Sequence, residues 1–237
     1  MNSKDRRRLW LRWVAVNAIG EMLGLGLTFA VGASVITRLE SQQSVTVVLI
    51  SFLVAVASGA IEATLVGLAQ WWAMHPWFPG ITRRAWWLAT LVGALLAYVL
   101  GYLPSTLMSL GEQASESQAP VAEPAQWIVL LLAAGLGVLG GAVLSFAQSL
   151  TMRKTVSRAF RWIPANMLAW LVGMPIIFWG IDVAQKLDGI WLLILFMAGI
   201  LFLAGLLVGA VHGAFLIRLA GPDRINSSTT GSIISPS

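Results

Sequence analysis

The sequence predicts an all-α membrane protein with six transmembrane helices, paired as three in–out–in hairpins of the same orientation. Three observations predict this fold: six long apolar runs, an uneven distribution of Lys and Arg between them, and a residue pattern that recurs three times. The chain has 237 residues, of which 58% are hydrophobic and 11% are charged. Soluble domains are about 45–50% apolar and about 25% charged. We therefore expect lipid, rather than a soluble core, to surround much of this chain.

Six apolar runs are long enough to cross a hydrocarbon layer about 30 Å thick, which needs roughly 20 helical residues. They lie at about 11–36, 44–72, 86–109, 127–150, 163–184 and 190–219. The segment 111–126 is polar and contains proline, as is typical of a solvated loop. We expect one transmembrane domain over 11–219, a basic cytoplasmic N-terminus at 1–10 and a disordered cytoplasmic tail at 220–237.

Lys and Arg residues predict the orientation, because cytoplasmic loops of membrane proteins carry an excess of both. With six helices, 13 of the 15 basic residues fall on the side of the two termini, and only Arg38 and Lys186 fall on the other. This division places both termini in the cytoplasm of a multi-pass protein of the cell inner (plasma) membrane. Tryptophans near the predicted helix ends fit this topology, since their rings anchor at lipid headgroups: Trp13, Trp71, Trp72, Trp86, Trp87, Trp127, Trp162 and Trp191.

A cleavable signal peptide is the alternative interpretation of the first run. Its basic start is suitable, and Ala30-Val31-Gly32 is a passable cleavage site. Against this, the run is longer than a normal signal segment and is interrupted by Asn17 and Glu21.

Two residue patterns recur along the chain at matching positions. The even-numbered runs share a face of mainly small residues: Gly59, Glu62, Ala63, Val66, Gly67, Gln70; Gly137, Gly140, Gly141, Leu144, Ser145, Gln148; Gly205, Val208, Gly209, His212, Gly213, Leu216. The odd-numbered runs share another stripe: Trp13, Asn17, Gly20, Gly24; Trp86, Thr90, Gly93, Ala97; Trp162, Asn166, Ala169, Gly173. Small residues let helices approach closely in a membrane. The patterns predict three hairpins, at about 13–72, 86–149 and 162–217, although packing alone is an alternative reason for the small faces.

These motifs resemble those of a group of uncharacterised bacterial polytopic membrane proteins. In that group, helix ends read Gly-x-x-Gln-Trp, followed by a basic loop and then Trp-x-x-Ala-Asn. The matching stretches are 67–71, the pair Arg83 and Arg84, and 162–166. The fourth and sixth runs depart from the pattern, with Ser145, Ser149 and Leu216 at the corresponding positions. The resemblance implies a fold type and no particular activity.

Two carboxyl groups, Glu21 and Glu62, lie inside apolar runs, where ionised groups are costly and usually face the interior of a bundle. Glu21 lies about 12 Å beyond Trp13, and Glu62 about 15 Å before Trp72, at 1.5 Å per residue. The two runs are consecutive and antiparallel, so we expect the carboxyls at similar depth and able to be neighbours. Close carboxyls disfavour double ionisation, which predicts a proton or cation site.

Four more polar residues complete the candidate intramembrane site. If the carboxyls have a structural role instead, we expect either a protonated pair or single carboxyls bonded to Asn17, Gln70 or a backbone carbonyl. Gln70 and Gln148 occupy equivalent positions near the cytoplasmic ends, where we expect them to cap or bridge helices. His212 is the only histidine within the six runs. We expect it to be a hydrogen-bonded packing residue, since a zinc site needs at least three protein ligands.

Ser145 and His212 invite comparison with rhomboid intramembrane proteases, which also have six core helices. Those enzymes carry the serine in Gly-x-Ser-Gly, whereas Ser145 lies between Leu144 and Phe146. Both residues also lie near the predicted cytoplasmic end, and the rhomboid site opens to the opposite side. The chain has no cysteine and no phosphate-binding loop, so we expect no enzymatic activity, no metal site and no cofactor.

The leading hypothesis is a small-solute or ion transporter or channel, because a carboxyl pair lies inside a repeat-built bundle. The alternative is a non-transporting scaffold or accessory subunit, which the small-residue faces and the lack of a strong site favour. Besides the lipid bilayer, a membrane-protein partner or a second copy of the chain is the expected partner. Nucleic acid is not, because the basic residues lie between apolar runs and not on one continuous face.

Overall fold

Six long helices and one short 3-10 turn make up the described part of the chain, which contains no strand. The computed structural model describes residues 1–39, 44–114 and 124–220. The elements are α1 (Ser3–Leu39), α2 (Val45–Met74), α3 (Arg83–Ala114), α4 (Gln126–Met152), η1 (Ala159–Arg161), α5 (Trp162–Ala184) and α6 (Ile190–Leu219).

All six helices are long and apolar enough to cross a membrane, so the described residues contain the six candidate spans that the sequence predicts. The predicted bounds agree with the observed ones to within a few residues, except at the end of α3, which continues to Ala114, and at the N-terminus. There α1 begins at Ser3, so most of the basic segment predicted over 1–10 is the first part of this helix. The tail over 221–237 lies outside the described residues. Of the predicted loop at 111–126, residues 111–114 belong to α3 and residues 115–123 also lie outside the described residues.

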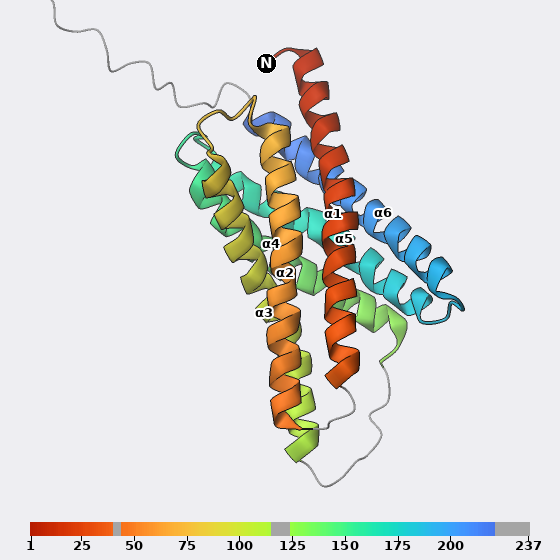
Figure 1. Cartoon of the computed structure of the whole chain (residues 1–237). Coiled ribbons are helices and arrows are strands. Elements are labelled where there is room, and N and C mark those ends of the chain that lie inside the picture. The colour runs from red at the N-terminus through yellow and green to blue at the C-terminus, as the bar shows by residue number, and fades with distance from the viewer. Residues whose placement is uncertain (40–43, 115–123, 221–237) are drawn as a thin grey trace, which may run out of the picture.

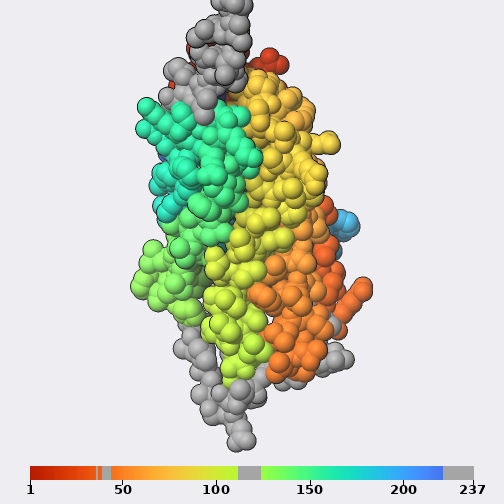
Figure 2. Space-filling view, turned by 90° about the vertical axis from the view of Figure 1, so that its left-hand side faces the viewer, coloured from red at the N-terminus to blue at the C-terminus, as the bar shows by residue number. Residues whose placement is uncertain are grey.

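The helices form a ring in which neighbours in sequence are neighbours in space. The main packing pairs are the consecutive ones from α1–α2 to α5–α6, and α6 packs on α1 to close the ring. Successive helices run in alternating directions, so α1 starts at the end of the bundle where α6 finishes (Figure 1). We call this end the N-terminal end. Figure 2 shows α2, α3 and α4 side by side on one face.

Glycines bring the helix backbones of this ring into direct contact. A Cβ added to Gly205 of α6 would lie 2.6 Å from the carbonyl oxygen of Asn17 in α1, and one on Gly137 of α4 would collide with the carbonyl oxygen of Trp170 in α5. Lipid provides little hydrophobic drive for helix association, so close packing of this kind stabilises membrane bundles.

The outside of the ring is apolar and its interior is partly polar. Leucines on the outer faces are strongly exposed, among them Leu53, Leu131 and Leu195. The buried polar residues instead include all six of the predicted candidate site: Glu21, Glu62, Asn17, Gln70, Gln148 and His212. This inside–outside contrast suits a chain whose surroundings are hydrocarbon.

Candidate functional site

Three tryptophans close the N-terminal end of the ring from within. Trp13, Trp86 and Trp162 are fully buried, and the ring of Trp162 lies 5.7 Å from that of Trp13 and 6.4 Å from that of Trp86. The prediction that these three rings anchor at lipid headgroups is therefore wrong. Each lies one helical turn before Asn17, Thr90 or Asn166, and so shares the inward face of its helix. By contrast, the exposed rings include Trp72, Trp127 and Trp191.

The tryptophans belong to a continuous hydrophobic cluster that fills this end of the ring. Side chains from α1, α2, α4, α6 and both connecting segments at this end surround them. Its buried members are Leu9, Trp13, Ala73, Met74, Phe78, Ile81, Trp86, Met152, Val156, Ala159, Trp162, Ala165, Leu216, Leu219 and Ala220. We call this cluster the tryptophan plug. No polar path through it is evident among the described residues.

His212 of α6 packs on the tryptophan plug. Its ring centroid lies 5.1 Å from that of Trp162 and 6.5 Å from that of Trp13. Neither ring nitrogen has a hydrogen-bond partner among the described residues. The predicted packing role is thus observed, but the hydrogen bond expected for this histidine is not.

Asn17 and Gln70 join α1 to α2 next to the plug. Asn17 Nδ2 donates to the carbonyl oxygen of Trp13, one turn earlier, over 2.7 Å. Gln70 Nε2 donates to Asn17 Oδ1 over 2.9 Å. Asn17 and Gln70 thus form a hydrogen bond with each other and not with the carboxyls. The alternative in which Asn17 or Gln70 binds Glu21 or Glu62 is therefore wrong.

Gln148 joins three helices at the corresponding place on the other side of the ring. Its Nε2 donates to Thr90 Oγ1 of α3 over 2.9 Å, and its Oε1 accepts from Trp162 Nε1 of α5 over 2.7 Å. Thr90 in turn donates to the carbonyl oxygen of Trp86. Gln70 and Gln148 therefore bridge helices, which is one of the two roles predicted for them.

Asn166 of α5 has only half of this arrangement. Its Nδ2 donates to the carbonyl oxygen of Trp162 over 2.9 Å, as Asn17 does to that of Trp13. Its Oδ1 is buried without a donor among the described residues. The position of α6 that corresponds to Gln70 and Gln148 holds Leu216, which has no donor to offer.

The Glu21 and Glu62 carboxyls lie against each other, one turn further from the plug. They are within hydrogen-bond reach, and such a bond requires a proton on one of the two. Gly24 allows this approach, because a Cβ there would be 3.0 Å from Glu62 Cα. Oxygen Oε2 of Glu21 is buried with no donor among the described residues. The two carboxyls, which the sequence left free to be neighbours or not, are thus neighbours in the structure.

Tyr98 of α3 is the third member of this cluster. Its hydroxyl donates a hydrogen bond to Glu62 Oε2. Its ring lies on Gly59 of α2, where an added Cβ would come within 2.8 Å of the ring. Sequence reasoning missed Tyr98, because an aromatic residue in an apolar helix is ordinary. One signal was available: the chain has only two tyrosines, and both Tyr98 and Tyr102 lie on one face of the same span.

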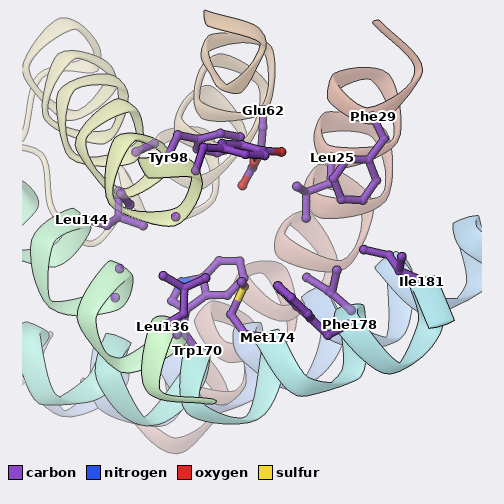
Figure 3. A pocket seen from close by; sticks show the side chains of 18 residues that line it. Leu25, Phe29, Glu62, Tyr98, Leu136, Leu144, Trp170, Met174, Phe178 and Ile181 are labelled. Carbon is purple, nitrogen blue, oxygen red and sulfur yellow. The ribbon is translucent and has the colours of Figure 1, made fainter. Parts of the chain in front are cut away.

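The cluster borders a cavity of about 310 Å³ in the interior of the ring. Figure 3 shows Glu62 and Tyr98 on one side of this cavity, facing Trp170, Met174 and Phe178 of α5 across it. Glu62 is 9% exposed and lines the cavity, whereas Glu21 is 2% exposed and lies behind it. A proton that moves between Glu21 and the cavity therefore passes by way of Glu62.

This arrangement can bind a proton or a cation and has little other chemistry to offer. Carboxylates accept hydrogen bonds and attract positive charge, and the buried location strengthens that attraction. Ser145, weighed above as a nucleophile, is fully buried and donates to the carbonyl oxygen of Gly141 in its own helix. Among the described residues, no group of three His, Cys, Asp or Glu side chains is placed to hold a metal ion.

Six apolar spans around a buried polar interior define the class: the chain is a polytopic membrane protein. Within that class, no family model, curated protein or solved structure matches the chain.

Proposed function

We propose that the protein is a transporter of a small solute or ion across the cell inner membrane, with the Glu21–Glu62 pair as its proton or cation site. One observation carries this proposal: a buried carboxyl pair borders a cavity in the middle of a membrane-spanning ring. Ionisable residues at such depth cost several kcal/mol and commonly mark ion or substrate pathways. The cavity beside Glu62 gives a solute a place to lie next to the pair.

The tryptophan plug favours a transporter over an open channel. The cavity borders Glu62 on the side away from the plug, while the N-terminal end of the ring is filled by a hydrophobic cluster that includes three fully buried tryptophans. A channel needs a continuous pathway, whereas a transporter opens its central site to one side at a time. This conformation corresponds to a state closed at the N-terminal end.

The same proposal includes three parallel hairpins and cytoplasmic termini. The bridge from Gln70 to Asn17 within the first hairpin has its counterpart in the bridge from Gln148 to Thr90 within the second. This correspondence supports the repeat. The distribution of Lys and Arg supports cytoplasmic termini, so the cavity faces the outer side of the membrane and the plug faces the cytoplasm.

A scaffold or accessory subunit is less well supported. That alternative depended on small-residue faces available to a partner. Gly59 and Gly67 instead pack on Tyr98 and Thr90 of the same chain, and Gly205 packs on α1. These glycines are occupied inside the ring.

The test uses the full chain in proteoliposomes that enclose a pH-sensitive dye. An outward gradient of sodium, potassium or an alkylammonium ion is imposed, and the resulting change of internal pH is compared with protein-free liposomes. We expect flux that falls by about tenfold or more in Glu21→Gln and Glu62→Gln, because each amide removes a proton-binding group from the pair.

The matched control is Asp188→Asn, the same chemical change at an exposed carboxyl in the turn between α5 and α6. It should keep the wild-type flux. Flux that is unchanged in both glutamate variants would overturn the carboxylate mechanism.

A further inference from the structure

The cavity lining combines aromatic and aliphatic side chains, and Glu62 is the one charged side chain among the described residues that form it. Five aromatic residues surround the space: Phe29 from α1, Tyr98 and Tyr102 from α3, and Trp170 and Phe178 from α5. Most of the remaining lining is aliphatic or glycine, and no Lys, Arg or His from the described part of the chain contributes to it. The lining therefore offers one negative group in an apolar, π-rich surface.

This chemistry discriminates between classes of solute. An anion would meet the Glu62 carboxylate without any basic group to pair with. A sugar or another strongly polar solute would lose hydrogen bonds to water that the apolar walls cannot replace. A small inorganic cation needs several oxygen ligands, whereas the lining offers one carboxyl and two phenols.

We propose that the cavity binds a monovalent organic cation with an apolar body, held by the Glu62 carboxylate and the surrounding aromatic rings, in exchange for a proton of the Glu21–Glu62 pair. Cations lie favourably over aromatic faces, the more so when water is excluded. The cavity of about 310 Å³ is at the lower end of the range for small-molecule sites, roughly 300–1,000 Å³. An ammonium ion carrying one aromatic ring is of suitable size.

Exchange follows from the geometry of the pair. The groups that face Glu62 are Glu21 from α1 and Tyr98 and Tyr102 from α3, and none of them is basic. Without a cation, the buried pair holds two protons and carries no charge. When the cation binds, one carboxyl O–H bond breaks and its proton passes to water in the cavity; the two carboxyls share the remaining proton, and their single negative charge balances the cation. This inference rests on the proposed function, because it names the substrate class of the same site.

The probe is benzyltrimethylammonium, titrated into the purified full-length protein by calorimetry in two buffers of different ionisation enthalpy. We expect saturable binding with release of close to one proton per cation. The affinity should fall by up to about tenfold for each pH unit of acidification, where the pair takes up a proton. Phenylacetate, an anion of similar size, should not bind.

Two substitutions locate the site. Glu62→Gln should weaken binding by about tenfold or more, since it removes the charge, and Tyr102→Leu by about fivefold, since it removes a ring and leaves the carboxyls in place. Asp188→Asn should bind as the wild type does. The proton-release measurement needs no variant, so it stands even if Glu62→Gln does not fold.

The outcomes separate this inference from the transport proposal. Three outcomes would each overturn the proposal that the cavity binds an organic cation. They are binding of phenylacetate as tight as that of the cation, binding of the cation without proton release, and full affinity in a folded Glu62→Gln protein. Transport would then still depend on the glutamates. Conversely, Glu62-dependent binding together with glutamate-independent flux would support this site and overturn the transporter mechanism.

Discussion

Gln70 donates from Nε2 to Asn17 Oδ1 over 2.9 Å, and this hydrogen bond ties α2 to α1 beside the tryptophan plug. Gln148 ties α4 to α3 in the same manner, with Thr90 in the place of Asn17. A buried amide that lacks its partner costs about 1–3 kcal/mol. Such bridges therefore fix how the two helices of each hairpin pair with one another.

The third hairpin lacks this bridge, which makes the repeat testable. Leu216 stands where a glutamine is expected, and Asn166 Oδ1 is buried without a donor. If the hairpins are equivalent, Leu216→Gln should place an amide donor on Asn166. We expect a melting temperature within a few degrees of the wild type in detergent, because the new hydrogen bond offsets the burial of the amide.

Leu219→Gln is the control, since Leu219 is also buried in the plug and no unpaired acceptor is known beside it. It should lower the melting temperature by several degrees, as expected for about 1–3 kcal/mol of uncompensated polar burial. In an Asn166→Ala background, Leu216→Gln should become as harmful as Leu219→Gln. Equal destabilisation by both glutamines in the wild-type background would contradict the repeat.

The sequence predicted the six spans well, because their apolar length depends on composition alone. It also predicted that Glu21 and Glu62 lie at similar depth on consecutive antiparallel helices and could be neighbours, but not that they touch. Depth, however, does not say which way a side chain points. Trp13 has the depth of a headgroup anchor, yet it shares a helical face with Asn17 and so lies inside the ring.

The cavity and Tyr98 could not be predicted, because both depend on which helices meet. The ring closes through the contact between α6 and α1, which nothing in the local sequence specifies. Tyr98 reaches Glu62 only because Gly59 leaves room for its ring on α2. The sequence places Gly59 on a small-residue face, but it does not say which helix packs there.

Gly137 and Gly135 make a matched pair for testing how α4 packs. A Cβ on Gly137 would collide with the carbonyl oxygen of Trp170, whereas one on Gly135 would meet nothing within 4 Å. Backbone contacts cannot yield as flexible side chains do, so Gly137→Ala must push α4 away from α5. We expect it to destabilise the protein by about 1–3 kcal/mol, measured as a lower melting temperature in detergent.

Gly135→Ala should be neutral or slightly stabilising, because alanine is the better helix former by about 1 kcal/mol. Gly137 and Trp170 both line the cavity, so Gly137→Ala should also alter binding of a cavity ligand, whereas Gly135→Ala should not. Equal melting temperatures for the two variants would mean that the α4–α5 contact is not as close as described.

Water access to the cavity, and the side of the membrane from which it comes, can be read from single cysteines. The chain has no cysteine of its own, so each introduced thiol is labelled without background. Ala97 of α3 lines the cavity, whereas Val92 of the same helix is 52% exposed on the outer face. A membrane-impermeant cationic thiol reagent should label Ala97→Cys from the outer side, because thiolates form only where water reaches them. Val92→Cys, facing lipid, should stay unlabelled from either side.

Labelling of Ala97→Cys only in inverted vesicles would reverse the proposed orientation, and no labelling from either side would contradict a water-filled cavity next to Glu62.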